Sequence, residues 1–405
     1  MLDRLRARLG TGLALLALAL ACAPAAPTPA GPAAAPTRMA TAPAAATAPA
    51  APVAPTTAPA APVAPTAPAA GASSPPTLVS IPAVSLKAGV IPQASYAPFF
   101  IAQGRGYFQE LGLNVELIPT GNVLEQLPAI AQGQLQVGSC STGVACYNAL
   151  NRRTDIQIVA DLQSAGKTAK STGNLALVVR KPVWDAGTIR TAPDLVGRSV
   201  YTIAGEGSGP HVVAAHWLER QGIDPRRVEF PAMNYPEVFA AMQNGAVDVG
   251  FSTEPLVTLG LTRGVHEILA TQEEMYPTTA RLYALYYKGI DQMGPQVGER
   301  FMVAYLRAAR DYINAFEYGV DLDAIVDILV AETPLKDHDT YKQIKYAWVD
   351  PNGLVQRETL EADAELLRRL DVMKEPLDLS GAFEPKYREF AVRYLGEYRP
   401  PAATN

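Results

Sequence analysis

The sequence is poor in the residues that build metal centres, disulfide scaffolds and nucleic-acid surfaces. It holds three cysteines and four histidines in 405 residues. His216, His266 and His338 show no metal-ligand spacing to one another, to cysteine or to carboxylates, so we read them as structural and expect no metal site. Three cysteines are too few for a disulfide scaffold. The net charge of −5 comes without a basic cluster, which argues against a nucleic-acid partner.

Phosphate-binding glycine motifs are also lacking, although one stretch invites the comparison. "GEGSGPH", residues 205–211, follows the apolar run "SVYTIA" and precedes "VVAAHWLERQG". Its spacing is not G-x-G-x-x-G, and no Gly-Lys-Ser/Thr follows, so it fits neither a dinucleotide fingerprint nor a phosphate loop. What remains is a helix N-terminus with free backbone N–H groups, with Ser208 as the expected cap. Two interpretations of residues 205–211 therefore remain, an ordinary capped helix start and a ligand site.

Only one long apolar run is present, and it lies at the N-terminus. "MLDRLRARLGTGLALLALALAC" joins three arginines to an apolar stretch that is too short to cross a bilayer and then reaches Cys22. We expect a signal peptide over residues 1–21 and lipidation at Cys22, hence an exported protein tethered to the cell membrane. Because Ala19 stands where leucine is commonest in a lipoprotein box, a plain signal peptide or an uncleaved anchor remains the alternative.

Residues 22–78 are almost wholly alanine, proline and threonine, and "TAPAAPVAPT" occurs twice in succession. This composition lacks apolar bulk, and its prolines remove backbone donors, so it predicts a disordered linker. The linker is long enough to hold a folded body near a membrane without fixing its position.

Strand and helix patterns alternate through the rest of the chain. Strand-like runs such as "VSLKAGVI", "NVELIPT" and "LQVGSC" are separated by helical segments, and a second series follows "NLALVVRKP". The pattern predicts an α/β protein with two parallel lobes. We expect the first lobe to span residues 79–181 and 282–400 and the second lobe residues 182–281. Two crossings between the lobes imply a hinge and an inter-lobe cleft.

The order of five segments carries a family resemblance. "APFFIAQGRGYFQELGLNVEL", "QLPAIAQGQLQVGSCSTG", "NLALVVRK", "DLVGRSVYTIAGEGSGPH" and "EVFAAMQNGAVDVGFSTEP" resemble the periplasmic solute-binding proteins of ABC importers that bind nitrate, sulfonates, taurine and thiamine-precursor pyrimidines. The resemblance covers nearly all of residues 82–320 and is similar to the riboflavin and pyrimidine-precursor branch. It implies a type II periplasmic-binding-protein fold, capture of the ligand in the inter-lobe cleft, and delivery of the ligand to a membrane permease with an ATPase. We expect a monomer that binds its ligand without a cofactor.

Turns that follow the predicted strands supply the candidate site. In open α/β sheets ligands sit outside the carboxyl ends of the strands, so these turns are expected to line the cleft. The candidate ligand-binding residues are Tyr96, Asn122, Ser141, Thr142, Gly207, Ser208, Gly209, His211, Tyr235 and Glu254.

The chemistry of these turns favours a planar heteroaromatic ligand. Tyr96 and Tyr235 offer flat faces for stacking, and Glu254 would accept hydrogen bonds and repel an anion. We therefore expect riboflavin, with a thiamine pyrimidine precursor as an alternative. A sulfonate or nitrate site remains open as well, because such a site needs only donors and helix N-termini provide them.

Cys140 and Cys146 leave two questions open. They could form one bridge in an oxidising compartment or remain small buried residues, and burial without a bridge is the simpler expectation. A pyrimidine synthase of the same fold uses a cysteine-rich loop and a lysine-bound pyridoxal cofactor, so "GSCSTGVAC" raises an enzyme alternative. The cysteines here are differently spaced and too few, so we expect no catalytic residues and no cofactor.

Overall fold

The computed structural model describes residues 75–152, 155–171, 173–277 and 280–402. The expected signal peptide, Cys22 and nearly all of the expected linker therefore lie outside the described residues. The chain contacts the folded body from Thr77, whose carbonyl accepts a hydrogen bond from Gln296 Nε2 at 3.1 Å. Within the described part of the chain, no helix combines the length and hydropathy needed to span a membrane.

A five-stranded sheet in the order β2-β1-β3-β8-β4 organises the first lobe. Its strands are β1 (Val84–Val90), β2 (Leu113–Pro119), β3 (Val137–Ser141), β4 (Ile156–Ser164) and β8 (Ala280–Tyr287). β1 pairs in parallel with β2 and β3, whereas β8 runs antiparallel to β3 and β4. The expected parallel sheet thus contains one antiparallel strand, because β8 is the strand that returns from the second lobe.

Helices cover both faces of this sheet. They are α1 (Ala97–Gly104), α2 (Tyr107–Glu110), α3 (Val123–Ala131), α4 (Val144–Asn151) and the long α10 (Val297–Tyr318), with a 3-10 turn η1 (Ala94–Tyr96) before α1. Residues 97–110 form two helices and not one, because Gly106 takes a left-handed φ of 74° that separates α1 from α2. Aromatic rings from α1 and α10, such as Phe99 and Tyr305, meet in the core of this lobe.

The second lobe repeats the strand order of the first. Its strands are β5 (Leu175–Arg180), β6 (Val249–Thr253) and β7 (His266–Thr271), with β5 in the centre and antiparallel to both neighbours. Parallel bridges from residues 199–202 to residues 229–232 and to Gly250 extend the sheet beyond β6. Because β5 pairs with β6 and β7, residues 175–180 belong to the second lobe, and the boundary expected at residue 181 lies before Leu175.

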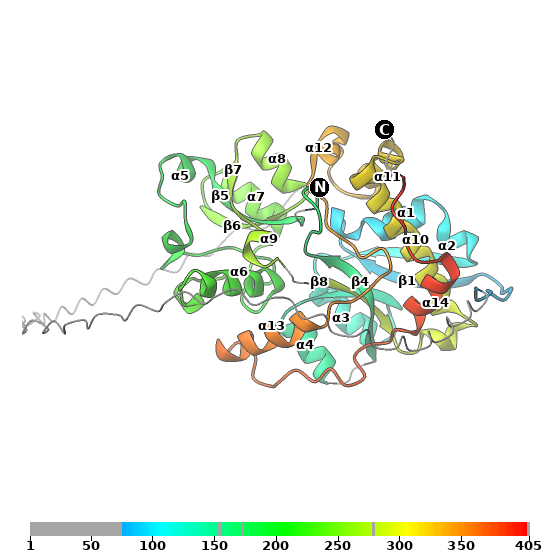
Figure 1. Ribbon diagram of the computed structural model, residues 1–405. Coiled ribbons are helices and arrows are strands. Elements are labelled where there is room, and N and C mark those ends of the chain that lie inside the picture. The colour runs from blue at the N-terminus through cyan, green and yellow to red at the C-terminus, as the bar shows by residue number, and fades with distance from the viewer. Residues whose placement is uncertain (1–74, 153–154, 172, 278–279, 403–405) are drawn as a thin grey trace, which may run out of the picture. The chain divides into compact units, whose positions relative to one another are not determined.

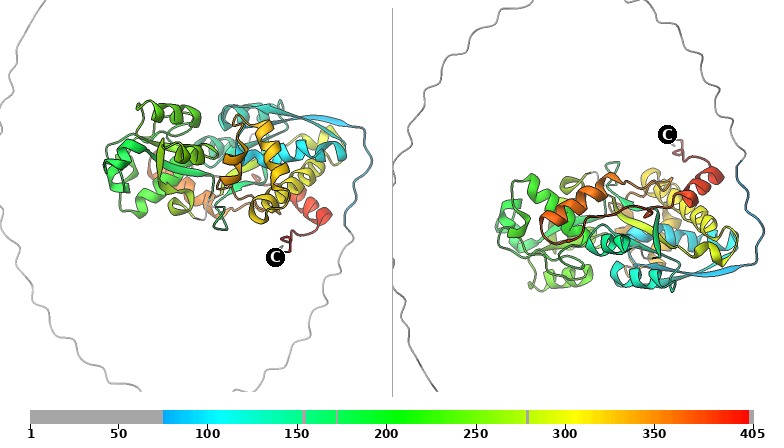
Figure 2. Two further views of the ribbon diagram at one scale, coloured as in Figure 1. Left: turned by 90° about the horizontal axis from the view of Figure 1, so that it is seen from above. Right: turned by 90° about the horizontal axis from the view of Figure 1, so that it is seen from below.

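The helices of the second lobe are α5 (Lys181–Asp185), η2 (Ala192–Leu195), α6 (Gly209–Arg220), η3 (Pro225–Arg227), α7 (Tyr235–Gln243), α8 (Leu256–Thr262) and α9 (Gln272–Met275). Proline stands in the first turn of α6 and α7, where its missing N–H breaks no hydrogen bond. Figure 1 shows these helices and β5–β7 as one group beside the larger first lobe, and the two views of Figure 2 keep the groups distinct.

The C-terminal part of the chain adds η4 (Ile290–Met293), α11 (Leu322–Glu332), α12 (His338–Gln343), α13 (Glu358–Arg369) and α14 (Lys386–Leu395). α11 packs on α1 and α14 packs on α10, as expected for elements of the first lobe. α13 differs because it contacts both α4 of the first lobe and α6 of the second (Figure 1). Residues 282–400, which the sequence assigned to the first lobe, therefore contain one helix, α13, that packs against both lobes.

Candidate functional site

A cavity of about 290 Å³ lies where the strand ends of the two lobes meet. We call it the cleft cavity. Seven of the ten residues predicted from the sequence line it, and they come from both lobes: Asn122, Ser141, Thr142, Gly207, Ser208, Gly209 and Tyr235. These residues follow strands, so the cavity lies at the edge of the sheets where ligand sites form in open α/β folds.

The two lobes touch at one edge of the cleft cavity. The N–H of Val144, at the start of α4, donates to the carbonyl of Gly207 at 2.9 Å. A Cβ added to Gly209 would lie 2.4 Å from Ser141 Oγ across the lobe boundary. Glycine at position 209 is therefore needed for the close approach of α6 to the turn after β3.

Three helices begin at the wall of this cavity. Asn122 caps α3 by accepting the N–H of Leu124 at 2.9 Å, and Ser208 caps α6 by accepting the N–H of His211 at 3.5 Å. α4 begins at Gly143 without a side-chain cap. The first four N–H groups of a helix have no acceptor within the helix, and they carry a partial positive charge. Some of these N–H groups are engaged, since Leu124, Val144 and His211 donate to protein acceptors. The helix starts still place partial positive charge at the cavity wall.

Two buried side chains add donors that have no partner among the described residues. Thr142 is 1% exposed and Asn174 is 2% exposed, and both line the cleft cavity. Thr142 Oγ1 and Asn174 Nδ2 make no hydrogen bond, although Asn174 Oδ1 accepts one from Gln163 Nε2. Leaving a buried polar atom unpaired costs about 1–3 kcal/mol. A bound molecule with acceptor atoms would remove this cost.

The charged side chains at the cleft cavity are few. None of the described residues that line it is lysine, arginine or histidine, and Glu206 supplies the sole carboxylate, on an exposed side chain. The favourable field for negative charge therefore comes from helix N-termini and neutral donors. Apolar side chains, including Ile91, Ile203 and Leu282, complete the wall.

His211 does not line the cleft cavity. Its side chain is 2% exposed, its Nδ1 accepts the N–H of Gly207 at 3.0 Å, and its ring packs against Phe230. Burial lowers the pKa of His211 to about 4, so the ring stays neutral and keeps its acceptor. The residue supports the turn of residues 207–209 from behind.

Tyr96 is placed elsewhere as well. Its ring is fully buried in the core of the first lobe, and its hydroxyl is 2.6 Å from Ser139 Oγ. Burial raises the pKa of Tyr96 above its ordinary value. The stacking role expected for Tyr96 is corrected accordingly, because η1 turns the ring into the sheet rather than toward the cleft.

Glu254 is not a wall of the cleft cavity either. Its carboxylate accepts hydrogen bonds from the backbone N–H and the hydroxyl of Thr258 and from the backbone N–H of Lys345. Burial raises the pKa of Glu254 to about 7, against the opposing effect of these hydrogen bonds. The carboxylate joins the start of α8 to the segment after α12, and it does not line the cleft cavity, where it was expected to accept hydrogen bonds from the ligand.

Cys140 and Cys146 form a disulfide with a Cα–Cα distance of 5.7 Å. Of the two alternatives that the sequence left open, the structure has the bridge and not the simpler unbridged pair. The bridge joins the end of β3 to the first turn of α4 and closes the loop of residues 141–145, which lines the cleft cavity. It restricts the same loop that presents Thr142.

Sequence reasoning missed Gln163 and Asn174. Gln163 lies near the end of β4 and Asn174 lies directly before β5, so both flank the crossing between the lobes. Their side chains are buried and line the cleft cavity. Neither residue lies in a turn between a strand and its helix, where the candidate site was expected. Polar residues at the ends of a crossing connection are a signal that could have found them.

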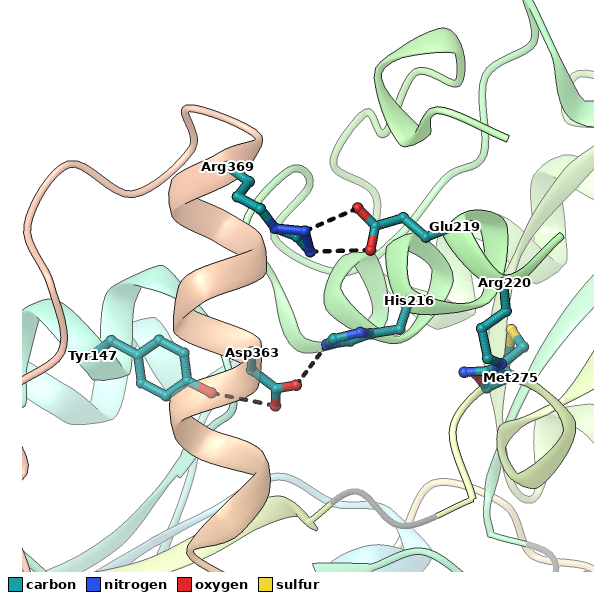
Figure 3. Close-up of polar contacts among 7 residues, drawn as sticks. All are labelled: Tyr147, His216, Glu219, Arg220, Met275, Asp363 and Arg369. Atoms are coloured by element: carbon teal, nitrogen blue, oxygen red, sulfur yellow. Dashed lines mark hydrogen bonds and ion pairs between the residues drawn. The ribbon is translucent and has the colours of Figure 1, made fainter. Parts of the chain in front are cut away.

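α13 ties the two lobes together beyond the cavity. Asp363, fully buried on α13, accepts a hydrogen bond from Tyr147 of α4 at 3.5 Å and lies 2.9 Å from His216 Nε2 of α6. Figure 3 shows this carboxylate between the two side chains, with an ion pair from Arg369 to Glu219 at the end of the same helix. Tyr147 and His216 thus join α4 and α6 to α13, which agrees with the structural role expected for His216.

Comparison with proteins of known structure supports the fold. The alkanesulfonate-binding protein SsuA from Xanthomonas axonopodis pv. citri, bound to MOPS, is 16% identical and gives a TM-score of 0.61, covering 76% of this chain and 100% of that one. The periplasmic nitrate-binding protein NrtA from Synechocystis PCC 6803 is 15% identical with a TM-score of 0.61, covering 78% and 89%. The expected periplasmic-binding-protein fold is confirmed.

One curated relative matches in sequence. The nitrate import ATP-binding protein NrtC of Synechococcus elongatus is 26% identical over 202 residues, which are 47% of this chain. The chain spans 30% of the length of that relative. The sequence model of the NMT1-like family matches residues 80–313, more than half of the chain. The family resemblance drawn from the sequence is confirmed, and this chain belongs to the NMT1-like family.

Proposed function

We propose that this chain is the substrate-binding protein of an ABC importer and that the cleft cavity captures a small organic anion with a sulfonate-type head group. One observation carries the choice of ligand. The N-termini of α4 and α6 meet at a cavity that holds the unpaired donors of Thr142 and Asn174, and no basic side chain lines it among the residues that the structure describes. Neutral donors and helix N-termini suit an oxyanion whose charge is spread over several acceptor oxygens.

The relatives support the same class of ligand. Two of the structural neighbours are named for binding alkanesulfonate and nitrate, and the curated relative is named for nitrate import. These ligands share a compact head group of acceptor oxygens. The cleft cavity, at about 290 Å³, lies near the lower end of the range for small-molecule sites.

Riboflavin is less well supported than it appeared from the sequence. Its predicted stacking pair required Tyr96 and Tyr235, but Tyr96 lies in the core and Tyr235 alone lines the cavity. Glu254, the expected acceptor for ring N–H groups, is bonded to Thr258 and Lys345. Two of the three contacts that favoured a flavin or an aminopyrimidine are therefore committed elsewhere.

The proposed transport role has the usual partners of such a protein. A membrane permease and its ATPase would receive the ligand, and the chain would act as a binder without chemistry of its own. We also propose that the chain is exported and anchored through lipid on Cys22, on the strength of the N-terminal sequence alone.

Calorimetry of the purified protein with ethanesulfonate, nitrate, riboflavin and an aminopyrimidine tests the ligand class. We expect ethanesulfonate to bind and riboflavin to be silent. Thr142→Val should weaken ethanesulfonate binding by about 10- to 150-fold, because a buried hydrogen bond to a charged group contributes about 1.5–3 kcal/mol.

Ser252→Ala is the matched control, since Ser252 is 2% exposed, has an unpaired hydroxyl and lies outside the cleft cavity. Its affinity should stay within twofold of the wild type. Riboflavin binding that is lost in Tyr235→Ala, together with no binding of ethanesulfonate or nitrate, would overturn the proposal and restore the flavin hypothesis.

A further inference from the structure

A second cavity of about 340 Å³ lies beside the cleft cavity. Its wall is formed by the turn after β1, the starts of α7 and α8, and the connection between α11 and α12. Most of the side chains there are apolar, and they include Pro92, Pro236, Pro255, Leu256, Pro334, Leu335 and Tyr341.

The two cavities share a common wall. Ile91, Gln93, Ile203, Tyr235 and Thr253 line both of them. A group attached to a ligand in the cleft cavity would have to pass these side chains to reach the second cavity. Tyr235 is the largest of the five and is 8% exposed.

The polar groups of the second cavity are mostly engaged with the protein. Glu254 is bonded to Thr258 and Lys345, and Glu237 accepts the N–H of Asn234 at 3.1 Å in the capping box of α7. The unpaired buried donors at the cleft cavity have no counterpart among the described residues that line this one. The second cavity thus offers apolar contact and no further place for charge.

We propose that the ligand carries a bulky apolar group in addition to its anionic head, and that this group occupies the second cavity under a roof made by Pro334 and Leu335. This inference rests on the proposed function and names the class of anion more narrowly. Pro334 and Leu335 belong to the connection between α11 and α12, in the C-terminal part of the first lobe, whereas Leu256 and Pro236 line the cavity from the second lobe. Both lobes therefore contact the apolar group.

This arrangement makes Leu335 a residue that determines ligand size. Its side chain is half-buried at the second cavity, and it does not line the cleft cavity. A larger side chain at position 335 would fill part of the second cavity, where we place the apolar group. It would not enter the cleft cavity, where we place the anionic head. Leu256, also half-buried, offers an independent route to the same result from the second lobe.

Calorimetry with ethanesulfonate and 1-hexanesulfonate tests the proposal. Burial of each added CH₂ group favours binding by about fourfold at most. We expect wild-type protein to bind 1-hexanesulfonate at least about tenfold more tightly than ethanesulfonate, allowing for incomplete burial of the chain. The ratio of the two affinities should fall to near one in Leu335→Trp and in Leu256→Trp.

Leu354→Trp is the control, because Leu354 is exposed and lines neither cavity, and it should keep the wild-type ratio. Equal affinities of the wild type for both sulfonates would overturn the second-cavity proposal and leave the proposed function standing. A wild-type ratio in both tryptophan variants, each shown by circular dichroism to be folded, would overturn it too. Failure of both sulfonates to bind the wild type would overturn the proposed function together with this inference.

Discussion

Substitution of Gly209 by alanine tests whether the contact between the lobes is needed to hold a ligand. The added Cβ would lie 2.4 Å from Ser141 Oγ and 2.8 Å from the carbonyl oxygen of Thr142, both in the opposite lobe. Gly209 is the first residue of α6 and has no left-handed φ, so alanine fits the helix itself. The clash therefore acts between the lobes and not within one of them.

The expected loss of ligand affinity follows from the contact between α6 and the turn after β3, which the added Cβ would force apart. Ordinary contacts of a Cβ begin near 3.4 Å, so the two segments must separate by roughly 1 Å, which strains the hydrogen bond from Val144 N–H to the Gly207 carbonyl. Overpacking of a well-packed region costs about 1–3 kcal/mol. If this cost falls on the ligand-bound form, affinity drops by about 5- to 150-fold.

Calorimetry with ethanesulfonate measures this loss, and small-angle scattering gives a readout that needs no ligand. Gly209→Ala should weaken binding and enlarge the radius of gyration. Gly104→Ala is the control, because Gly104 lies in α1 and an added Cβ would meet only the side chain of Ile328, at 3.0 Å. Wild-type affinity and wild-type scattering in Gly209→Ala would refute the reasoning, since the lobes would then not need this approach.

Three further predictions follow from single residues. Glu206→Gln should tighten ethanesulfonate binding by up to about fivefold in calorimetry, because it removes an exposed negative charge at the cavity, and unchanged or weaker binding would contradict this. His211 has a pKa of about 4 in the folded protein against 6.5 for an ordinary histidine, so the stability that its neutral ring contributes is complete above pH 6.5 and is lost as the pH falls toward 4. Urea unfolding should show wild-type protein losing about 3 kcal/mol more than His211→Asn between pH 7.5 and pH 4, and parallel pH profiles would contradict the assignment. Asp363→Ala should lower the free energy of unfolding by about 3 kcal/mol by leaving buried partners unpaired, whereas Arg369→Ala, which breaks an exposed ion pair, should cost less than about 1 kcal/mol; equal losses in chemical denaturation would refute this contrast.

Much of the fold was predictable from the sequence because local signals agree with the tertiary structure. The alternation of strand and helix patterns, the glycine that ends α10 and the proline in the first turn of α6 all report local backbone preferences. The boundary before β5 was harder to place. Leu175–Arg180 is an apolar strand that either sheet would bury, and only its pairing with β6 and β7 assigns it to the second lobe.

The candidate site was predictable where position along a strand decides it. Ser141, Thr142 and the turn of residues 207–209 follow strands and reach the cavity. The direction of a side chain is a different matter, because a tyrosine after a strand can turn toward the core or toward the cleft. Tyr96 turns toward the core and Tyr235 lines the cleft cavity, and no local sequence pattern distinguishes the two residues.

A crystal structure of the protein grown with ethanesulfonate tests the central claim most directly. We predict sulfonate oxygens within hydrogen-bonding distance of Thr142 Oγ1, Asn174 Nδ2 and the backbone N–H groups at the starts of α4 and α6. The ethyl group should point toward Tyr235. A sulfonate bound outside the cleft cavity, or a cavity in which these donors pair with the protein while the ligand lies elsewhere, would contradict it.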